Sequence, residues 1–319
     1  MRVRSLVIAA VGCLWLLPAT ASAVHVQCGD TITQDTKLDS NVVCTDQDPV
    51  GLVIGGNDLT LGLSGFTIQG ADAAGSDGIA DDGTARTGVT VRHGTITGFE
   101  DGIDLDVSDS QILKVGVNAT SVGIATRGNG NYIYRNPVDM IVSGFSGIEA
   151  LGDDSYLWGN YVTGTEGFSP DDGIVVAGNN PRIILNEIDG CSFDGIVLSG
   201  YTDGIVARNT VTNCDIGFNP SGTNLRLQTN SASGNCVGMT VDDPLARVRW
   251  NTANDNCAEG IQILQAGTSL LKNTANNNAE IGIDAPVGTI DLGSNTATGN
   301  PVANCIGVIC LPPALLPPD

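Results

Sequence analysis

Aromatic residues and histidine are scarce in this chain, which limits the folds and sites that it can build. Aromatic residues make up 4% of the 319 residues, and only two residues are histidine. Conventional helical and α/β cores bury large rings, so this composition argues against them. The cysteines contain no C-x-x-C spacing, and with so little histidine the sequence predicts no zinc site.

Positive charge is scarce as well. The chain has 14 Lys and Arg against 35 Asp and Glu, a formal net charge of −21 at pH 7. A surface of this charge repels nucleic acid and anionic lipid, so we expect neither as a partner. It also repels acidic polysaccharides, unless a divalent cation bridges the two negative charges.

Long hydrophobic runs are confined to the N-terminus. Arg2 and Arg4 precede the apolar stretch Leu6–Leu17, and Ala21-Ser22-Ala23 supplies the small residues of a cleavage site, as in a secretory signal peptide. About 12 apolar residues are too few to cross a bilayer, which needs roughly 20. We therefore expect residues 1–23 to be removed, leaving a secreted or periplasmic protein without membrane insertion.

The chain is rich in internal repetition. An asparagine returns in the same context at steps of 21 to 26 residues, each time followed two positions later by Val, Ile or Ala. A Gly-Ile pair, sometimes Gly-Phe or Gly-Met, keeps the same spacing. A sustained period near 22 is typical of a chain wound into stacked coils. The repeating asparagines are Asn136, Asn160, Asn186, Asn209, Asn230, Asn251, Asn273 and Asn295.

Each repeat predicts three short strands. In one coil they are expected at Arg182–Leu185, at Glu187–Asp189 and at 195–197. Asn186 turns the corner between the first two, because Asn tolerates the left-handed conformation of a tight turn and stacked amides can hydrogen-bond from coil to coil. The positions three before and two after each Asn are apolar throughout, as core-facing columns should be.

These patterns predict an all-β fold, a single-stranded right-handed parallel β-helix of about eleven coils. It is expected to occupy residues 24–311, with disulfides at both ends. The Pro-rich tail, residues 312–319, cannot join a sheet and is expected to be disordered.

Eight cysteines remain after removal of the signal, an even number that suits an oxidising compartment. Four of them follow the repeat. Coils stacked ~4.8 Å apart bring neighbouring Cα atoms within disulfide range. The repeat therefore predicts two bridges, Cys191–Cys214 and Cys236–Cys257, and we expect the remaining cysteines to pair at the two ends as Cys28–Cys44 and Cys305–Cys310.

The sequence resembles the right-handed parallel β-helices of the pectate-lyase-like superfamily. The resemblance rests on CGDTITQDTKL, LGLSGFTIQG, VRHGTITGF and the repeated N-x-[VIA] and Gly-Ile motifs. It covers nearly the whole chain after the signal. It implies a β-helix fold and an activity drawn from polysaccharide lyases, hydrolases and epimerases, or from members without demonstrated chemistry.

Acidic residues cluster just before or within the Gly-Ile strands. They are Asp77, Asp101, Asp104, Asp106, Glu149, Asp171, Asp172 and Asp194. Asp172 and Asp194 fall in the same phase on adjacent coils, where two close carboxylates could perform acid/base chemistry or bind Ca²⁺. Turn residues and solvated charges are the alternative interpretation.

The stretch Ser169–Val176 is similar to the strand that carries paired catalytic aspartates in polygalacturonase-type hydrolases. That resemblance implies Asp171 and Asp172 as acid and base. The chain departs from the family where Phe145-Ser146-Gly147 replaces a further aspartate, and it lacks the family's Gly-His-Gly and Arg-x-Lys motifs. Of the two histidines, His93 is expected to form a corner.

An outward-facing group of aromatic residues is the second candidate site. Tyr132 and Tyr134 lie on one coil, and Tyr156 and Trp158 occupy the same positions on the next. Sugar rings stack on such side chains. The same two columns continue through Arg182, Arg226, Arg247 and Arg249, which are donors to hydroxyls or carboxylates. Cross-strand pairing of the rings is the alternative.

Two functions follow from these residues. The first is an exported β-helix that binds or processes polysaccharide, with hydrolase, lyase and epimerase chemistry all open. The second is a non-catalytic structural or adhesive protein of the cell surface. The sequence does not separate them, because stacked coils are predicted whether or not any coil is catalytic.

Overall fold

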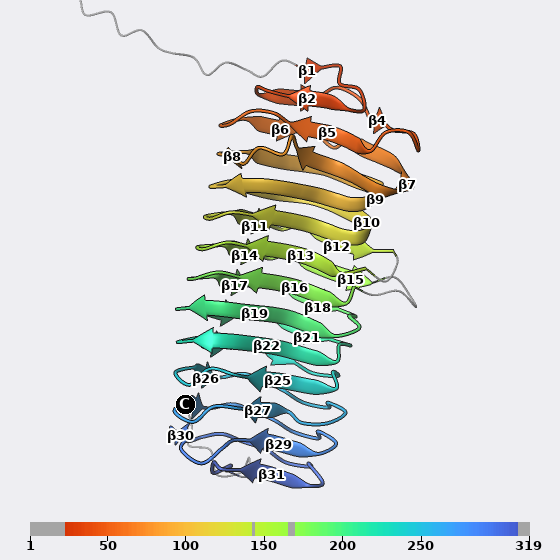
Figure 1. Cartoon of the computed structure of the whole chain (residues 1–319). Helices are drawn as coiled ribbons and strands as arrows, with labels where there is room; N and C mark the ends of the chain where they lie inside the picture. The colour runs from red at the N-terminus through yellow and green to blue at the C-terminus, as the bar shows by residue number, and fades with distance from the viewer. Residues whose placement is uncertain (1–22, 142–143, 165–169, 312–319) are drawn as a thin grey trace, which may run out of the picture.

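Stacked parallel strands build an elongated rod of about twelve turns (Figure 1). The structure is a computed structural model that describes residues 23–141, 144–164 and 170–311. These residues form 31 strands and no helix, so no helix among them could span a membrane. The predicted all-β solenoid is confirmed, with a number of turns close to expectation. The predicted tail and all but the last residue of the predicted signal peptide lie outside the described residues.

Each turn contributes to three sheets, which form three faces of the rod. The long strands β7 (Thr67–Asp81), β9 (Thr90–Ser108) and β10 (Gln111–Arg127) bend at corners and pair on more than one face. The first sheet carries the Gly-Ile repeat and is called the Gly-Ile face. Besides parts of β7, β9 and β10, it contains β2 (Asp30–Ile32), β5 (Val50–Ile54), β13 (Ser146–Leu151), β16 (Asp172–Ala177), β19 (Asp194–Thr202), β22 (Ile216–Thr223), β25 (Val237–Val241), β27 (Ile261–Ile263), β29 (Ile281–Asp284) and β31 (Ala303–Ile306).

The second sheet precedes the asparagine corner and is called the Tyr-Arg face, after the residues that it exposes. It contains β1 (Ala23–Val24), β3 (Thr36–Leu38), β6 (Thr60–Gly62), the first residues of β9 and β10, β11 (Tyr132–Tyr134), β14 (Tyr156–Trp158), β17 (Arg182–Ile184), β20 (Ile205–Ala207), β23 (Arg226–Gln228), β26 (Arg247–Arg249), β28 (Ser269–Leu271) and β30 (Ile290–Asp291).

The third sheet follows the asparagine corner. It contains β4 (Val42–Val43), parts of β7, β9 and β10, β12 (Pro137–Met140), β15 (Tyr161–Gly164), β18 (Glu187–Asp189), β21 (Thr210–Thr212) and β24 (Ser231–Ala232). Isolated bridges from Thr252 to Thr274 and on to Thr296 extend it. The short strand β8 (Arg86–Thr87) pairs with the end of β9.

A ladder of buried asparagines runs along the rod, but the asparagine is not the residue that adopts the left-handed conformation at the corner. In each coil the left-handed residue is the one before the asparagine, for example Arg135 at φ 52° and Arg208 at φ 57°. The asparagine points inward and is almost fully buried. The backbone N–H of Asn186 donates to the Oδ1 of Asn209 at 2.8 Å, and the same bond recurs from coil to coil. The predicted stacking of amides is confirmed, and the predicted left-handed asparagine is wrong.

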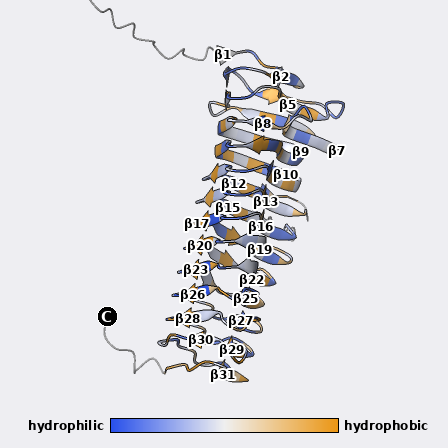
Figure 2. Cartoon of the chain, turned by 60° about the vertical axis from the view of Figure 1, so that its left-hand side comes forward, coloured by the Kyte–Doolittle hydropathy of each residue, from blue (hydrophilic) through white to orange (hydrophobic). Residues whose placement is uncertain are grey.

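The two predicted apolar columns line the core. The residues three before and two after each asparagine are at most 4% exposed, with one exception. Leu292 is 47% exposed, because the last strand is shifted and Leu270 pairs with Asp291 instead. Apolar and polar residues alternate along the strands, as Figure 2 shows, so that each strand turns one side to the core.

The four predicted disulfides are present, and two of them join neighbouring coils. Cα atoms lie 4.7 Å apart in Cys191–Cys214 and 4.3 Å apart in Cys236–Cys257. The Cys28–Cys44 and Cys305–Cys310 bridges close the first and last coils. A second, unpredicted asparagine ladder begins beside the first pair, where the backbone N–H of Cys214 donates to Asn235. It consists of Asn235, Asn256, Asn278 and Asn300.

Candidate functional site

Three columns of outward positions define the exposed surface of the Tyr-Arg face. In each coil they are the first and third residues of the short strand and the left-handed residue that follows. Over nine successive coils, from Thr90 to Lys272, these positions hold nine cations and no Asp or Glu. The cations are Arg92, Lys114, Arg135, Arg182, Arg208, Arg226, Arg247, Arg249 and Lys272.

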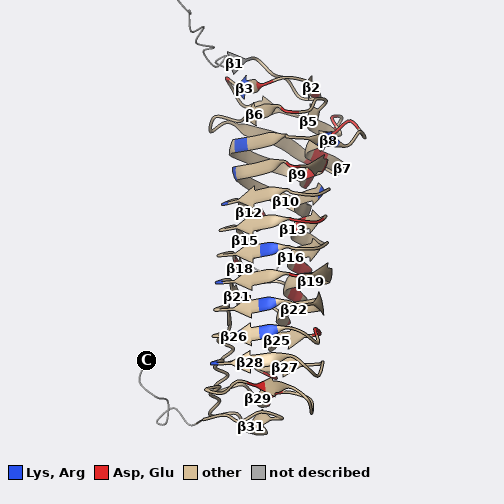
Figure 3. Cartoon of the chain, turned by 90° about the vertical axis from the view of Figure 1, so that its left-hand side faces the viewer, with Lys and Arg blue, Asp and Glu red and all other residues tan. Residues whose placement is uncertain are grey.

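This sorting of charge is unexpected in so acidic a chain. Lys37 lies two coils above Arg92 in the same columns, in register with Gly62 and through it with Arg92. The other two Lys or Arg residues in the described ranges, Arg86 and Arg127, form ion pairs with Asp82 and Asp104. Figure 3 shows Lys and Arg on the strands that face the viewer and Asp and Glu gathered along another edge of the rod. Net charge alone predicts a uniformly negative surface, whereas positive and negative side chains lie on different faces of the rod.

The four predicted aromatic residues come together as expected, but their rings pair with one another. The ring centroids of Tyr132 and Tyr156 are 5.0 Å apart, and those of Tyr134 and Trp158 are 4.9 Å apart, both pairs stacked. The guanidinium of Arg135 lies 4.8 Å from the Trp158 ring centroid. The rings are half-buried, so stacking covers part of the faces that a sugar would need. The three tyrosine hydroxyls have no hydrogen-bond partner among the described residues and remain open to a ligand.

Sequence reasoning missed a more exposed ring, that of Trp250. This residue holds the left-handed corner position of its coil, at φ 55°, and is 46% exposed. It takes part in none of the stacked pairs found among the described rings. With Arg226, Arg247 and Arg249 it lines a hollow of about 350 Å³. The signal was available in the sequence, since Trp250 directly precedes a repeat asparagine.

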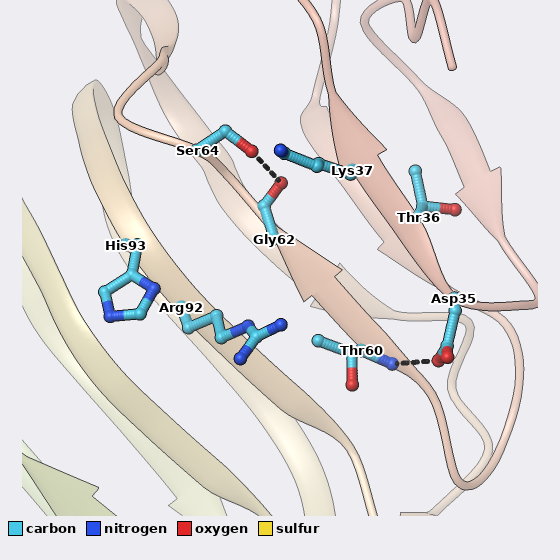
Figure 4. A pocket seen from close by; sticks show the side chains of 8 residues that line it. All are labelled: Asp35, Thr36, Lys37, Thr60, Gly62, Ser64, Arg92 and His93. Carbon is cyan, nitrogen blue, oxygen red and sulfur yellow. Dashed lines mark hydrogen bonds between the residues drawn. The ribbon is translucent and has the colours of Figure 1, made fainter. Parts of the chain in front are cut away.

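Two further hollows lie on the same face. One, of about 330 Å³, is lined by Arg182 and Arg226 together with the edge residues Asp154 and Asp203. The other, of about 520 Å³, lies near the N-terminal end (Figure 4). There Lys37 and Arg92 approach β6 from the strands on either side.

His93 and Asp35 also line this N-terminal hollow. His93 has φ 59°, which confirms its predicted role as a corner residue. Asp35 is engaged by the backbone N–H of Thr60 at 2.8 Å. The hollow therefore combines two cations and a histidine with a carboxylate that is already hydrogen-bonded.

The structure brings the predicted carboxylates Asp172 and Asp194 together on the Gly-Ile face. Ile174 pairs with Ile196, so the two aspartates share one phase on adjacent coils, as predicted. The backbone N–H of Asp194 donates to Asp172 Oδ1 at 3.1 Å. Burial raises the pKa of both carboxyls, and repulsion from Asp194 adds to the rise in the pKa of Asp172.

Asp171, the third predicted carboxylate, sits beside this pair in sequence. Its backbone N–H donates to the carbonyl oxygen of Gly144 at 2.7 Å. None of the three hollows on the Tyr-Arg face is lined by Asp171, Asp172 or Asp194. The predicted acidic and aromatic sites are therefore separate surfaces, as their places in the repeat indicated.

Asp77 and Asp101 form a second carboxylate pair, and the pKa of Asp77 is raised further than that of Asp172 or Asp194. The two are register partners on β7 and β9. Burial, followed by repulsion from Asp101, raises the pKa of Asp77 to about 6. Both residues belong to the predicted acidic cluster, but irregular turns between these coils hid their pairing.

A metal site finds no support in the described ranges. Within 23–141, 144–164 and 170–311, no group of three or more His, Cys, Asp or Glu side chains is arranged to hold an ion. Asp172 and Asp194, for which Ca²⁺ was considered, belong to no such group of side chains in these ranges.

Comparison with known proteins identifies the fold. A family model described as "Right handed beta helix region" matches residues 146–310. No curated protein matches the chain. The solved Dettilon tailspike protein (gp208) is similar at 16% identity and a TM-score of 0.57, over 83% of this chain and 62% of the tailspike. A single mutant of the periplasmic alginate epimerase AlgG is similar at 12% identity and a TM-score of 0.57, over 88% of this chain and 76% of the epimerase. The chain thus spans less than two thirds of the tailspike, and at these identities the likeness concerns the fold alone.

Proposed function

The chain belongs to the right-handed β-helix family, and from this premise we propose that it is an exported protein that binds polysaccharide along its Tyr-Arg face. Export is supported by four disulfides, which persist in oxidising compartments. A similar fold occurs in an enzyme named for its action on alginate, a polysaccharide. The proposal itself depends on the face and not on that likeness.

One observation carries the proposal: aromatic rings, open hydroxyls and arginines share a single flat sheet. Trp250 offers an exposed ring beside three arginines, and axial C–H groups of a sugar are attracted to such a ring. Arginine forks and tyrosine hydroxyls donate to sugar hydroxyls and carboxylates. The columns run along the rod from coil to coil, so an extended chain can contact several coils in turn.

The proposal places any cleavage or epimerisation of the bound polysaccharide on the Gly-Ile face. Asp172 and Asp194 lie on adjacent coils and both have a raised pKa, as acid/base catalysis uses, with Asp171 beside them as the third candidate. In that case Asp172→Ala abolishes product formation while the circular dichroism spectrum and melting temperature stay near those of the native protein. Unchanged turnover in Asp172→Ala would remove these residues from the proposal.

A non-catalytic adhesive role is the second candidate, and one observation favours it. The three hollows described above lie on the Tyr-Arg face, and the predicted carboxylates line none of these three. Binding without turnover would follow from this separation.

The proposal is tested with a panel of polysaccharides offered to the protein, with and without Ca²⁺. Retention of intact chains is scored together with new reducing ends and with the ultraviolet absorbance of unsaturated products. Retention without product supports a binding protein, and product names the reaction class. A panel with neither result would contradict the proposed function.

A further inference from the structure

We propose that the Tyr-Arg face is a track for a linear anionic polysaccharide, which it holds by direct contact with Arg and Lys and without Ca²⁺. This inference rests on the proposed function and specifies the class of its ligand. It replaces the expectation that so acidic a protein needs a divalent cation in order to bind an acidic polysaccharide.

The local charge of the face carries the first step of the argument. Exposed charges are screened over a Debye length of ~8 Å at physiological ionic strength. A ligand on this face therefore responds mainly to the nearest side chains and less to the net charge of −21. From Thr90 to Lys272 the three columns contain nine cations and no carboxylate. In the hollow lined by Arg182 and Arg226, the edge residues Asp154 and Asp203 offset part of this positive charge.

The availability of four arginines of the track is the second step. The three ion pairs found in the described part of the chain involve His25, Arg86 and Arg127. Arg182, Arg226, Arg247 and Arg249 belong to none of them, so their guanidinium groups can bind carboxylate or sulfate groups in a bidentate manner.

The spacing of the cations is the third step. Eight of the nine coils contribute at least one Lys or Arg, and the exception is the coil that carries Tyr156 and Trp158. Since coils repeat every ~4.8 Å, the track extends over roughly 40 Å. A polymer with charges at regular intervals can meet a new cation at almost every coil, which sums weak exposed contacts into useful affinity.

The state of the aromatic rings favours a polysaccharide over a nucleic acid. Proteins bind single strands by stacking bases on free aromatic faces. Here the Tyr132 and Tyr134 rings are stacked on each other and on those of Tyr156 and Trp158. Among the described Tyr and Trp rings of the three columns this pairing leaves Trp250 as the one free face for a base, whereas the open tyrosine hydroxyls suit a sugar chain.

The test compares one polymer in two charge states, alginate and its carboxyl-reduced neutral form, by biolayer interferometry in EDTA. The native protein is compared with Arg182→Gln/Arg208→Gln on the track. Arg86→Gln/Arg127→Gln is the matched control, since it removes the same charge away from the track. Circular dichroism melting checks that each variant is folded.

We expect alginate to bind in EDTA and to weaken steeply as salt rises. The track variant should bind alginate about tenfold more weakly, while the control variant binds within twofold of the native protein. Equal affinity for the two polymers, or alginate binding only with Ca²⁺, would overturn the anionic track and leave the proposed function standing. Binding of neither polymer, across the wider panel as well, would count against the proposed function itself. Single-stranded DNA binding as tight as alginate would overturn the choice of a polysaccharide.

Discussion

The asparagine ladder makes a quantitative prediction for Asn209, a residue in the middle of the rod. Its side chain is 1% exposed and joins three coils. Its Oδ1 accepts from the backbone N–H of Asn186 at 2.8 Å, and its Nδ2 donates to the carbonyl of Ile183 at 2.8 Å. In Asn209→Ala both of these backbone groups lose a buried partner.

Each buried group left without a partner costs about 1–3 kcal/mol. We therefore expect Asn209→Ala to lower the free energy of unfolding by about 2–6 kcal/mol. The matched control is Asn129→Ala. Asn129 is exposed, and its Oδ1 accepts a single bond from the backbone N–H of Asp153. That substitution should cost less than about 1 kcal/mol, because water replaces the lost partner.

Urea denaturation followed by circular dichroism measures both variants against the native protein. A loss for Asn209→Ala no larger than that for Asn129→Ala would refute the reasoning, because it would mean that the ladder bonds are not formed or are replaced at no cost. Substitution of the neighbouring corner residue, Arg208→Gly, should be tolerated, since glycine adopts its left-handed φ of 57° without strain.

Three further predictions concern pH, disulfides and the exposed ring. The raised pKa of Asp77, about 6, means that the folded state holds this proton more tightly than the unfolded state. Stability should therefore fall as pH rises from about 4 to about 7, by well under the ~3 kcal/mol of the full shift, because Asp77 is half-exposed and solvent screens its charge. Asp77→Asn should flatten this part of the melting-temperature profile. The disulfide Cys191–Cys214 closes a 23-residue separation, so replacing both cysteines by Ser should cost about 3 kcal/mol in urea denaturation. Trp250→Ala should weaken polysaccharide retention about two- to tenfold in affinity electrophoresis, since ring contacts contribute roughly 0.5–1.5 kcal/mol. Phe193→Ala, an equally simple loss of an exposed ring elsewhere, should leave retention unchanged.

The coil could be predicted because its determinants are local and repeated. The apolar columns and the Gly-Ile spacing specify three strands and their register without any knowledge of long-range contacts. The expected strand pairs, such as Tyr132 with Tyr156, follow directly. The period breaks at the last coil, and there the expectation for Leu292 was wrong.

The role of the corner residues could not be read from preferences alone. Asparagine favours both left-handed turns and buried amide ladders, so its type does not reveal which of two neighbouring positions turns the chain. Assigning the turn to the asparagine hid the column before it, which contains Lys114, Arg208 and Trp250. The arginines of the two strand columns, such as Arg182 and Arg226, were expected from the repeat. The exclusion of carboxylates from these columns was not inferred, because net charge carries no information about which face a residue occupies.

Hydroxyl-radical footprinting of the protein with a bound polysaccharide tests the central claim most directly. Mass spectrometry then reports the oxidation of each exposed aromatic side chain. Binding on the Tyr-Arg face predicts protection of Trp250 and Trp158, with Phe145 and Phe193 unchanged. Phe193 precedes Asp194 in sequence, and the carbonyl oxygen of Phe145 accepts a hydrogen bond from the backbone N–H of Asp172 at 3.0 Å. Protection of Phe145 and Phe193 with Trp250 and Trp158 still fully oxidised would contradict the claim.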